Sequence, residues 1–235
     1  EDLILNLMLG DCLERMKEIP DGTVDMILCD LPYGTTQNKW DSVIAFDALW
    51  AEYERICKGA VVLTAAQPFT SALVMSNPKW FKYQWVWDKS QVTGFLNAKR
   101  QPLRRHEDVL VFYGAQPTYN PQFAQGTPYS ISRAHGSDNY GSQAENRTES
   151  DGRRYPTSIL GIPQSREKGG HPTQKPVALM EYLIRTYTNE GDTVLDNCMG
   201  SGTTGVACKN LNRSFIGIEK DEKYFEIAKV RIEAA

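Results

Sequence analysis

Cysteine and histidine are sparse in this 235-residue chain, and their spacing forms no metal or disulfide pattern. Three histidines are present, and the five cysteines include no C-x-x-C pair: Cys12, Cys29, Cys57, Cys198 and Cys208. Most of these cysteines lie in apolar or helical surroundings, so reduced packing residues explain them better than zinc ligands or disulfides. We therefore predict no metal site and a cytoplasmic location, because disulfides are typical of oxidising compartments.

Long hydrophobic runs are also missing. No apolar run approaches the roughly 18 residues that a membrane-spanning helix needs. The N-terminal residues EDLILNLMLGD are acidic where a secretory signal is basic, and they lack a small-residue cleavage site. These features predict a strand at the N-terminus and a protein with no membrane association.

Short apolar segments alternate with amphipathic segments along most of the chain. The predicted strands are residues 3–9, 23–29, 60–64, 83–87, 109–113, 192–196 and 214–219. The predicted helices are residues 12–19, 46–57, 68–77, 176–188, 203–211 and 221–233. Strands that alternate with helices form a mainly parallel sheet with helices on both faces, so the predicted fold class is α/β.

Residues 114–170 interrupt this pattern. They are rich in Gly, Ser, Gln, Asn, Pro and Tyr and show little periodicity, as a disordered linker would. They also contain aromatic residues among arginines, a combination that suits nucleic-acid contact: Tyr119, Phe123, Tyr129, Tyr140 and Tyr155. We predict a target-recognition insertion at 114–170, between two parts of one main domain at 1–113 and 171–235.

Charge is divided unevenly between the middle of the chain and the rest. The net charge is −3, yet residues 89–175 carry 12 Lys/Arg and 7 Asp/Glu, a balance of +5. The remaining residues carry 14 and 22, a balance of −8. A face built for a polyanion explains this asymmetry, and chance variation of surface charge is the alternative.

A glycine-rich loop follows the predicted strand at 192–196. Gly200, Gly202 and Gly205 have the spacing G-x-G-x-x-G, and Glu219 ends the next predicted strand. Glycine lets a ligand approach the backbone, and an acid on the second strand can bind ribose hydroxyls. These features alone fit NAD as well as a nucleoside sulfonium. Asp196 favours the sulfonium, because a carboxylate there would repel a pyrophosphate and attract an ammonium group.

The run D-x-x-x-G-S-G-T-T-G from Asp196, with F-I-G-I-E ending at Glu219, resembles the S-adenosylmethionine motif of DNA amino-methyltransferases. The resemblance implies a Rossmann-like methyltransferase fold that binds S-adenosylmethionine and releases S-adenosylhomocysteine. Asp196, Gly200 and Gly202 would line the methionine end, and Glu219 would bind the ribose. The same motif adds three candidates for cofactor binding, which are Ser201, Thr203 and Lys220.

Two further segments resemble the same family. The sequence H-P-T-Q-K-P at residues 171–176 implies that Thr173 and Lys175 reach the methionine region, where a lysine suits a carboxylate. The sequence L-G-D-C at residues 9–12 resembles a segment in which Asp11 contacts the cofactor adenine, and it makes Cys12 a further candidate.

The tetrapeptide D-L-P-Y at residues 30–33 follows a predicted strand, at the end where open α/β sheets bind ligands. An exocyclic amino group of adenine or cytosine is a poor nucleophile, because its lone pair is delocalised into the ring. The Asp30 carboxylate and the Leu31 carbonyl can each accept one N–H, which frees the lone pair for in-line attack on the sulfonium methyl. Pro32 would stiffen this loop, and Tyr33 would stack on a base flipped out of the duplex.

The tetrapeptide resembles the D-P-P-Y motif of DNA amino-methyltransferases, and its place before the glycine motif matches the permuted arrangement called the beta class. Leu31 departs from the family, which usually has proline there, so loop rigidity is in question while the acceptor carbonyl remains. The basic residues ahead of H-E-x-x-L-x-F resemble the family's arginine-rich segment. Phosphate contact and a solvated surface can each explain them; they are Lys99, Arg100, Arg104 and Arg105.

We therefore predict a site-specific DNA methyltransferase that acts on the N6 amino group of adenine. N4-cytosine methylation uses the same chemistry but usually has serine in place of Asp30. Cytosine C5 methylation needs a Pro-Cys nucleophile, and the chain has no Pro-Cys pair. An NAD-dependent oxidoreductase would not explain the tetrapeptide, and a non-enzymatic DNA-binding module would not need Asp196. The candidate partners are DNA with a flipped base, a second copy of the chain and a cognate restriction endonuclease.

Overall fold

The computed structural model describes residues 3–34, 43–133, 136–137, 141–142, 146–164 and 174–235. The chain forms two compact units. The first unit contains residues 1–120 and 158–235, and the second unit contains residues 121–157.

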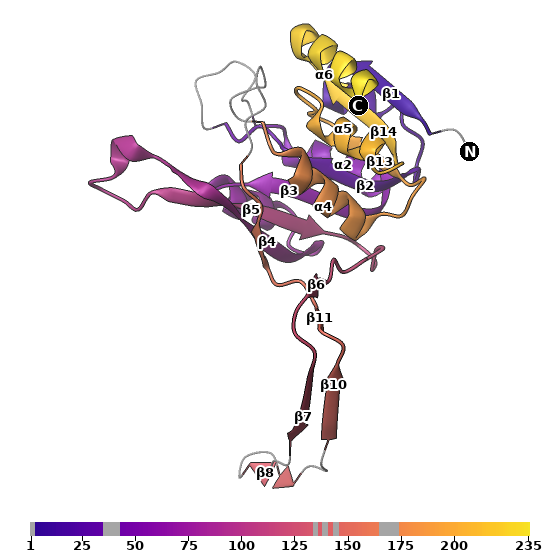
Figure 1. Ribbon diagram of the computed structural model, residues 1–235. Helices are drawn as coiled ribbons and strands as arrows, with labels where there is room; N and C mark the ends of the chain where they lie inside the picture. Colours follow the sequence, from indigo (N-terminus) through magenta and orange to yellow (C-terminus); the bar gives the residue numbers. More distant parts are fainter. Residues whose placement is uncertain (1–2, 35–42, 134–135, 138–140, 143–145, 165–173) are drawn as a thin grey trace. The chain divides into compact units, whose positions relative to one another are not determined.

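An eight-stranded sheet forms the centre of the first unit (Figure 1). Its strands, in spatial order, are β1 (Leu5–Leu9), β14 (Ser214–Glu219), β13 (Thr193–Asp196), β2 (Val24–Cys29), β3 (Cys57–Ala65), β5 (Arg104–Phe112), β4 (Phe81–Thr93) and β12 (Ile159–Gly161). β5 runs antiparallel to both of its neighbours, and the other strand pairs are parallel. The mainly parallel sheet predicted from the sequence is therefore confirmed.

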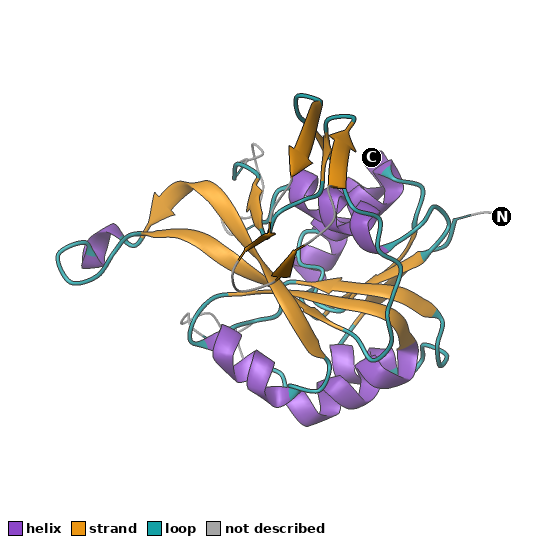
Figure 2. Ribbon diagram, turned by 90° about the horizontal axis from the view of Figure 1, so that it is seen from below, coloured by secondary structure: helices purple, strands orange, loops and turns teal. Residues whose placement is uncertain are grey.

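Helices cover both faces of this sheet (Figure 2). One face packs against α1 (Cys12–Met16), α2 (Phe46–Ile56) and α3 (Phe69–Ser76), and the other against α4 (Val177–Tyr187), α5 (Thr203–Asn210) and α6 (Glu222–Ala234). Along β2, Ile27 and Cys29 enter the first core, whereas Met26 and Leu28 enter the second. Both faces are apolar, which explains the continuous hydrophobic run of β2. No helix among the described residues is long and apolar enough to cross a membrane.

The chain changes its winding direction between β13 and β2. From β13 it passes through α5 to β14 on one side, and from β2 it passes through α2 to β3 on the other. Because the two connections lead away from each other, the carboxyl ends of β13 and β2 form a topological switch point, the place at which open α/β sheets bind ligands. Asp196 ends β13 and Asp30 follows β2, so both candidate residues lie at this point.

Three strands are longer than the sequence predicts: β3 spans Cys57–Ala65 where residues 60–64 are predicted, and β4 and β5 are extended further. The apolar pattern indicates residues 83–87 and 109–113, but β4 and β5 reach Thr93 and Arg104 and extend beyond the sheet as a hairpin (Figure 1). Residues 90–93 and 104–106 are exposed in this extension. No core-facing side marks them as strands in the sequence, because alternation needs one buried face.

The second unit is shorter than the insertion predicted at residues 114–170. The backbone N–H of Asn120 donates to the carbonyl of Thr186 on α4, and β12 pairs with β4. Both flanks of the predicted insertion therefore belong to the first unit, held there by backbone hydrogen bonds that the composition does not reveal.

Short antiparallel strand pairs build the second unit. β7 (Tyr129–Arg133) pairs with β10 (Asn146–Ser150), β6 (Ala124–Gln125) with β11 (Arg153–Arg154), and β8 (Gly136–Ser137) with β9 (Gly141–Ser142). Arg153 lies over the ring of Phe123 at 5.3 Å, and Arg154 over that of Tyr129 at 4.8 Å. These cation–π contacts order arginines and aromatic rings together, and a role in target recognition stays a prediction.

Candidate active site

The tetrapeptide at residues 30–33 is anchored by Leu31. This side chain is only 3% exposed and packs in the core between the sheet and α1–α3. The site where the family usually has proline is thus filled by an apolar side chain that burial holds in place. Packing therefore contributes rigidity that the missing proline ring would otherwise supply.

The carboxylate of Asp30 accepts hydrogen bonds from three side chains. Lys175 Nζ lies 2.9 Å from Oδ2, and the Tyr33 hydroxyl lies 2.9 Å from Oδ1. The hydroxyl of Thr64, near the end of β3, also donates to Oδ1. An ionised carboxylate has about four lone-pair sites, so Asp30 can accept one further N–H. Its side chain is 34% exposed, which leaves the carboxylate reachable from outside.

Charges of alternating sign continue behind Asp30. Lys175 Nζ lies 3.1 Å from Oε2 of Glu107, and Lys89 Nζ lies 3.0 Å from Oε1. The contact between Lys175 and Glu107 lacks hydrogen-bond geometry, so it is an ion pair. The side chains of Lys89, Glu107 and Lys175 are largely buried, and each alone would be costly there. Together with Asp30 they form a row of four charges, the Lys89–Asp30 row, in which neighbours have opposite sign.

Burial and pairing oppose each other in the Lys89–Asp30 row. Burial lowers the pKa of Lys175, but the nearby carboxylates of Asp30 and Glu107 outweigh it and hold this pKa well above its usual value. Burial raises the pKa of Glu107, but Lys175 and Lys89 outweigh it and leave this pKa lowered. Lys175 and Glu107 therefore both remain charged at neutral pH.

The ring of Tyr33 packs against Phe69 of α3. The ring centroids are 5.0 Å apart and the planes are inclined by 24°. Burial, followed by the charge of Asp30, raises the pKa of the Tyr33 hydroxyl well above its usual value. The hydroxyl thus keeps its proton and acts as a donor to Asp30. Stacking of Tyr33 on a flipped base stays a prediction.

The glycine loop joins β13 to α5. Gly200 and Gly202 have φ angles of +50° and +82°, which favour glycine. A Cβ on Gly202 would also lie 2.9 Å from the Cβ of Ala228 on α6. The loop is therefore tight because two of its positions accept only glycine without strain.

Asp196 lies under this loop and is 4% exposed. Its carboxylate accepts a hydrogen bond of 2.6 Å from the Thr204 hydroxyl and one of 3.1 Å from the backbone N–H of Cys198. Burial nevertheless raises its pKa to about 6. A cationic group that approached Asp196 would favour the ionised form.

Glu219 is held at the tip of β14 by backbone donors. Its carboxylate oxygens accept hydrogen bonds of 2.9 Å from the N–H groups of Gly200 and Asp221. These bonds fix the carboxylate beside the glycine loop and leave further lone pairs for other donors.

The other predicted cofactor residues are scattered around this end of the sheet. Asp11 caps α1, since its Oδ1 accepts hydrogen bonds from the N–H groups of Leu13 and Glu14. Cys12 is buried, and a hydrogen bond with the Cys198 thiol raises its pKa. Ser201 and Thr203 are buried in and after the glycine loop, Lys220 is exposed, and Thr173 lies outside the described residues.

The predicted DNA-binding residues lie on the hairpin of β4 and β5. Lys99, Arg100 and Arg104 are exposed. Arg105 forms a bidentate pair with Asp88, at 2.8 and 2.9 Å. The structure therefore gathers all four basic side chains, of which Arg105 is held in an ion pair, on one projecting element.

Sequence reasoning missed three residues around this site: Thr64 contacts Asp30, Glu107 contacts Lys175, and Lys89 contacts Glu107. Thr64 is a polar residue near the end of a predicted buried strand, and that position is a usable signal. Glu107 is a charged residue that directly precedes an apolar strand segment, whereas Lys89 carries no signal because its partner is 18 residues away.

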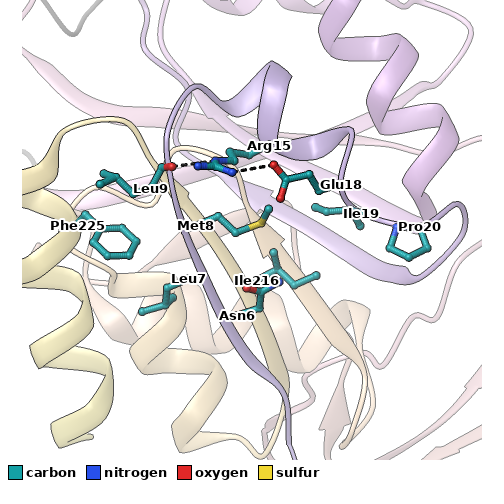
Figure 3. A pocket seen from close by; sticks show the side chains of 10 residues that line it. All are labelled: Asn6, Leu7, Met8, Leu9, Arg15, Glu18, Ile19, Pro20, Ile216 and Phe225. Atoms are coloured by element: carbon teal, nitrogen blue, oxygen red, sulfur yellow. Dashed lines mark hydrogen bonds and ion pairs between the residues drawn. The ribbon is translucent and has the colours of Figure 1, made fainter.

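A hollow at the outer edge of the sheet is separate from this site (Figure 3). It has a volume of about 480 Å³ and is lined by residues of β1, α1 and their neighbours, among them Met8, Arg15 and Phe225. Arg15 is fixed across it by the Leu9 carbonyl at 2.8 Å and by Glu18 at 2.7 Å. None of the predicted catalytic or cofactor residues lines it.

The chain is similar in sequence to known DNA methylases. A family model for N6/N4 enzymes, described as "DNA methylase", matches residues 24–230. The type II methyltransferase M.HpaI of Haemophilus parainfluenzae is 28% identical over 97% of this chain and 74% of its own length.

Solved structures share the fold. A crystal structure of an M1.HpyAVI–SAM complex has a TM-score of 0.65 at 28% identity and covers 97% of this chain and 98% of its own. The cytosine-N4-specific PvuII DNA methyltransferase has a TM-score of 0.69 at 15% identity and covers 97% and 87%. The predicted methyltransferase fold is therefore confirmed.

Proposed function

Because the chain belongs to the N6/N4 DNA methylase family, we propose that it transfers a methyl group from S-adenosylmethionine to the N6 amino group of adenine in DNA. The observation that carries this proposal is the Asp30 carboxylate, which follows β2 at the switch point next to β13 and has one acceptor position left for an amine. Adenine is favoured over cytosine because the N4-cytosine enzymes usually have serine where this chain has Asp30.

The reaction needs positioned acceptors more than a covalent intermediate. One N–H of the amino group would donate to Asp30 and the other to the Leu31 carbonyl, which draws the nitrogen towards tetrahedral geometry. The lone pair can then attack the sulfonium methyl in line, which breaks the S–CH3 bond and releases S-adenosylhomocysteine, and the methylated nitrogen loses one of its two protons to solvent. Lys175 and the hydroxyls of Tyr33 and Thr64 hold the Asp30 carboxylate in one orientation beforehand, so little reorganisation is left for the reaction itself.

The glycine loop would hold the cofactor. Asp196 would bind the ammonium group of the methionine moiety, and Glu219 would bind the ribose hydroxyls. The loop backbone allows close approach at Gly200 and Gly202. The 28% identity to M1.HpyAVI, which has been crystallised with SAM, supports the same cofactor here.

Cofactor binding is expected to weaken below about pH 6. The raised pKa of Asp196, about 6, means that binding of an ammonium group at lower pH must expel a proton. At pH 5 only about one-tenth of Asp196 is ionised, so the dissociation constant should be about tenfold higher than at pH 7. Calorimetry with S-adenosylhomocysteine, which carries the same ammonium group, measures this. Asp196→Asn should bind weakly with a flat profile, and a wild-type constant unchanged from pH 5 to 7 would contradict the role of Asp196.

One assay tests the proposed function. The protein is incubated with methyl-labelled S-adenosylmethionine and DNA of varied sequence, and the modified nucleoside is identified by mass spectrometry. We expect N6-methyladenine. N4-methylcytosine would overturn the adenine assignment, and absence of label from every DNA would overturn the function.

A further inference from the structure

The hairpin of β4 and β5 ends in a tip that no core explains. Beyond the sheet, its two strands project from the first unit and are joined by a single 3-10 turn, η1 (Phe95–Asn97) (Figure 1; Figure 2). Phe95 is 65% exposed and Leu96 is fully exposed, side by side at this turn. Single exposed apolar residues are ordinary on protein surfaces, but two adjacent large apolar residues are rarely left exposed on a projecting tip.

The backbone of this tip is ordered by its own hydrogen bonds. Gly94 has a φ of +92° and begins the turn, and its carbonyl accepts from Asn97 N–H at 2.9 Å. The Phe95 carbonyl accepts from Ala98 N–H at 3.1 Å. The Asn97 carbonyl accepts from the N–H groups of Arg100 and Gln101, at 2.9 and 3.1 Å. Phe95 and Leu96 are therefore presented on a preformed turn.

The surroundings of the tip are purely basic. Residues 89–105 include five Lys/Arg and no Asp or Glu. Lys89 is buried against Glu107, and Arg105 is exposed but paired with Asp88. The other exposed cations of this segment are Lys99, Arg100 and Arg104. Lys99 and Arg100 follow η1 within three residues, and Arg104 begins β5 opposite Thr93, so the positive charge lies on the same tip as the two apolar side chains.

Polyanionic DNA fits this combination better than a protein partner does. Two apolar side chains bury far less than the roughly 1,000 Å² that a specific protein interface needs. A segment that carries Lys and Arg but no Asp or Glu attracts the phosphates of DNA. Apolar side chains between cations suit the gap between two base pairs, where Phe and Leu are common wedges.

Resting on the proposed function, we propose that Phe95 and Leu96 form a wedge that enters the base stack of duplex DNA beside the target base, while Lys99, Arg100 and Arg104 contact the flanking phosphates. The wedge separates neighbouring bases and thereby favours extrusion of the target towards Asp30. These residues position the substrate and take no part in methyl transfer.

The test compares three forms of the DNA sequence that the wild-type protein methylates, after that sequence has been mapped on plasmid DNA. The target base is placed in a fully paired duplex, opposite a mismatch, or in a single strand. Phe95→Ala with Leu96→Ala should lower kcat/KM at least tenfold on the paired duplex, because no wedge then offsets the free energy needed to unstack and flip the target base. The loss should shrink to about threefold or less on mismatched DNA, whose base is already partly unstacked.

Two variants serve as controls. Val230→Ala removes a side chain that is 64% exposed on α6, near the opposite edge of the sheet, and should change none of the three rates. Lys99→Gln with Arg100→Gln should lower the affinity for all three DNA forms by similar factors. It should also reduce the dependence of binding on salt, as loss of phosphate contacts requires.

The outcomes separate this proposal from the proposed function. A wild-type protein that methylates no DNA refutes the function itself. A tip variant with wild-type kcat/KM on paired duplex refutes the wedge, and so does an equal loss on all three DNA forms. A loss confined to paired duplex, with an unchanged melting temperature, supports it.

Discussion

Replacing Asp30 by asparagine is expected to lower the rate of methyl transfer by about 10²–10³-fold, the loss typical of removing one preorganised polar group from an active site. The amide keeps the shape of the carboxylate but has only one oxygen. If that oxygen faces Lys175, the NH₂ group faces the hydroxyls of Tyr33 and Thr64 and the incoming amine, where donor meets donor. Single-turnover transfer from labelled S-adenosylmethionine measures the chemical step.

Cofactor binding and folding should be affected far less than the rate. Asp30 would contact the amine of the base, whereas Asp196 and Glu219 would hold the cofactor. Asp21→Asn is the matched control, since the same change is made at a side chain that is 78% exposed and, among the residues that the structure describes, is paired only with Arg55. A D30N protein that keeps more than a tenth of the wild-type rate would refute the acceptor role. A D30N protein that also loses its fold would show that Asp30 is structural.

Site residues could be predicted from the sequence where they lie at the end of a strand or in the loop that directly follows it. Asp30 follows β2 and Asp196 ends β13, and both strands are continuous apolar runs because helices cover both faces of the sheet. Parallel strands bring their carboxyl ends to one edge, so the two acids could be placed together without knowing the strand order.

Contacts that depend on strand order could not be predicted. Glu107 reaches Lys175 because β5 is inserted antiparallel between β3 and β4, and nothing local in the sequence specifies that insertion. Lys175 was predicted to reach the methionine region, and this stays a prediction; the contacts of its Nζ with Asp30 and Glu107 were not predicted. The tip of the hairpin escaped prediction because both of its faces are exposed.

Replacing Glu107 by glutamine is expected to destabilise the protein by about 3–5 kcal/mol, the usual cost of removing one partner from a buried ion pair. The change leaves Lys89 and Lys175 buried with Asp30 as the remaining carboxylate in the row. For a chain of this size the melting temperature should fall by on the order of 10 °C. Thermal and urea unfolding, followed in parallel, measure the loss.

The pH dependence of this loss has a definite sign. The pKa of Glu107 is lowered in the folded protein, so its stabilisation is complete above the usual value near 4.5 and is lost as the pH falls through the folded value. The difference in unfolding free energy between wild type and Glu107→Gln should therefore shrink in acid. A difference that stayed constant from pH 7 to pH 3 would contradict an electrostatic cause.

A second replacement separates the charge of Glu107 from its packing. Lys89→Gln in the Glu107→Gln background removes the excess positive charge, and two amides can still hydrogen-bond across the 3.0 Å contact of the wild type. We expect the double variant to be more stable than Glu107→Gln alone, with a coupling free energy of about 1–3 kcal/mol from the double-mutant cycle. Strict additivity of the two changes would instead mean that Glu107 acts through packing. Recovery of stability without recovery of the transfer rate would assign Glu107 a second role, namely to hold Lys175 against Asp30.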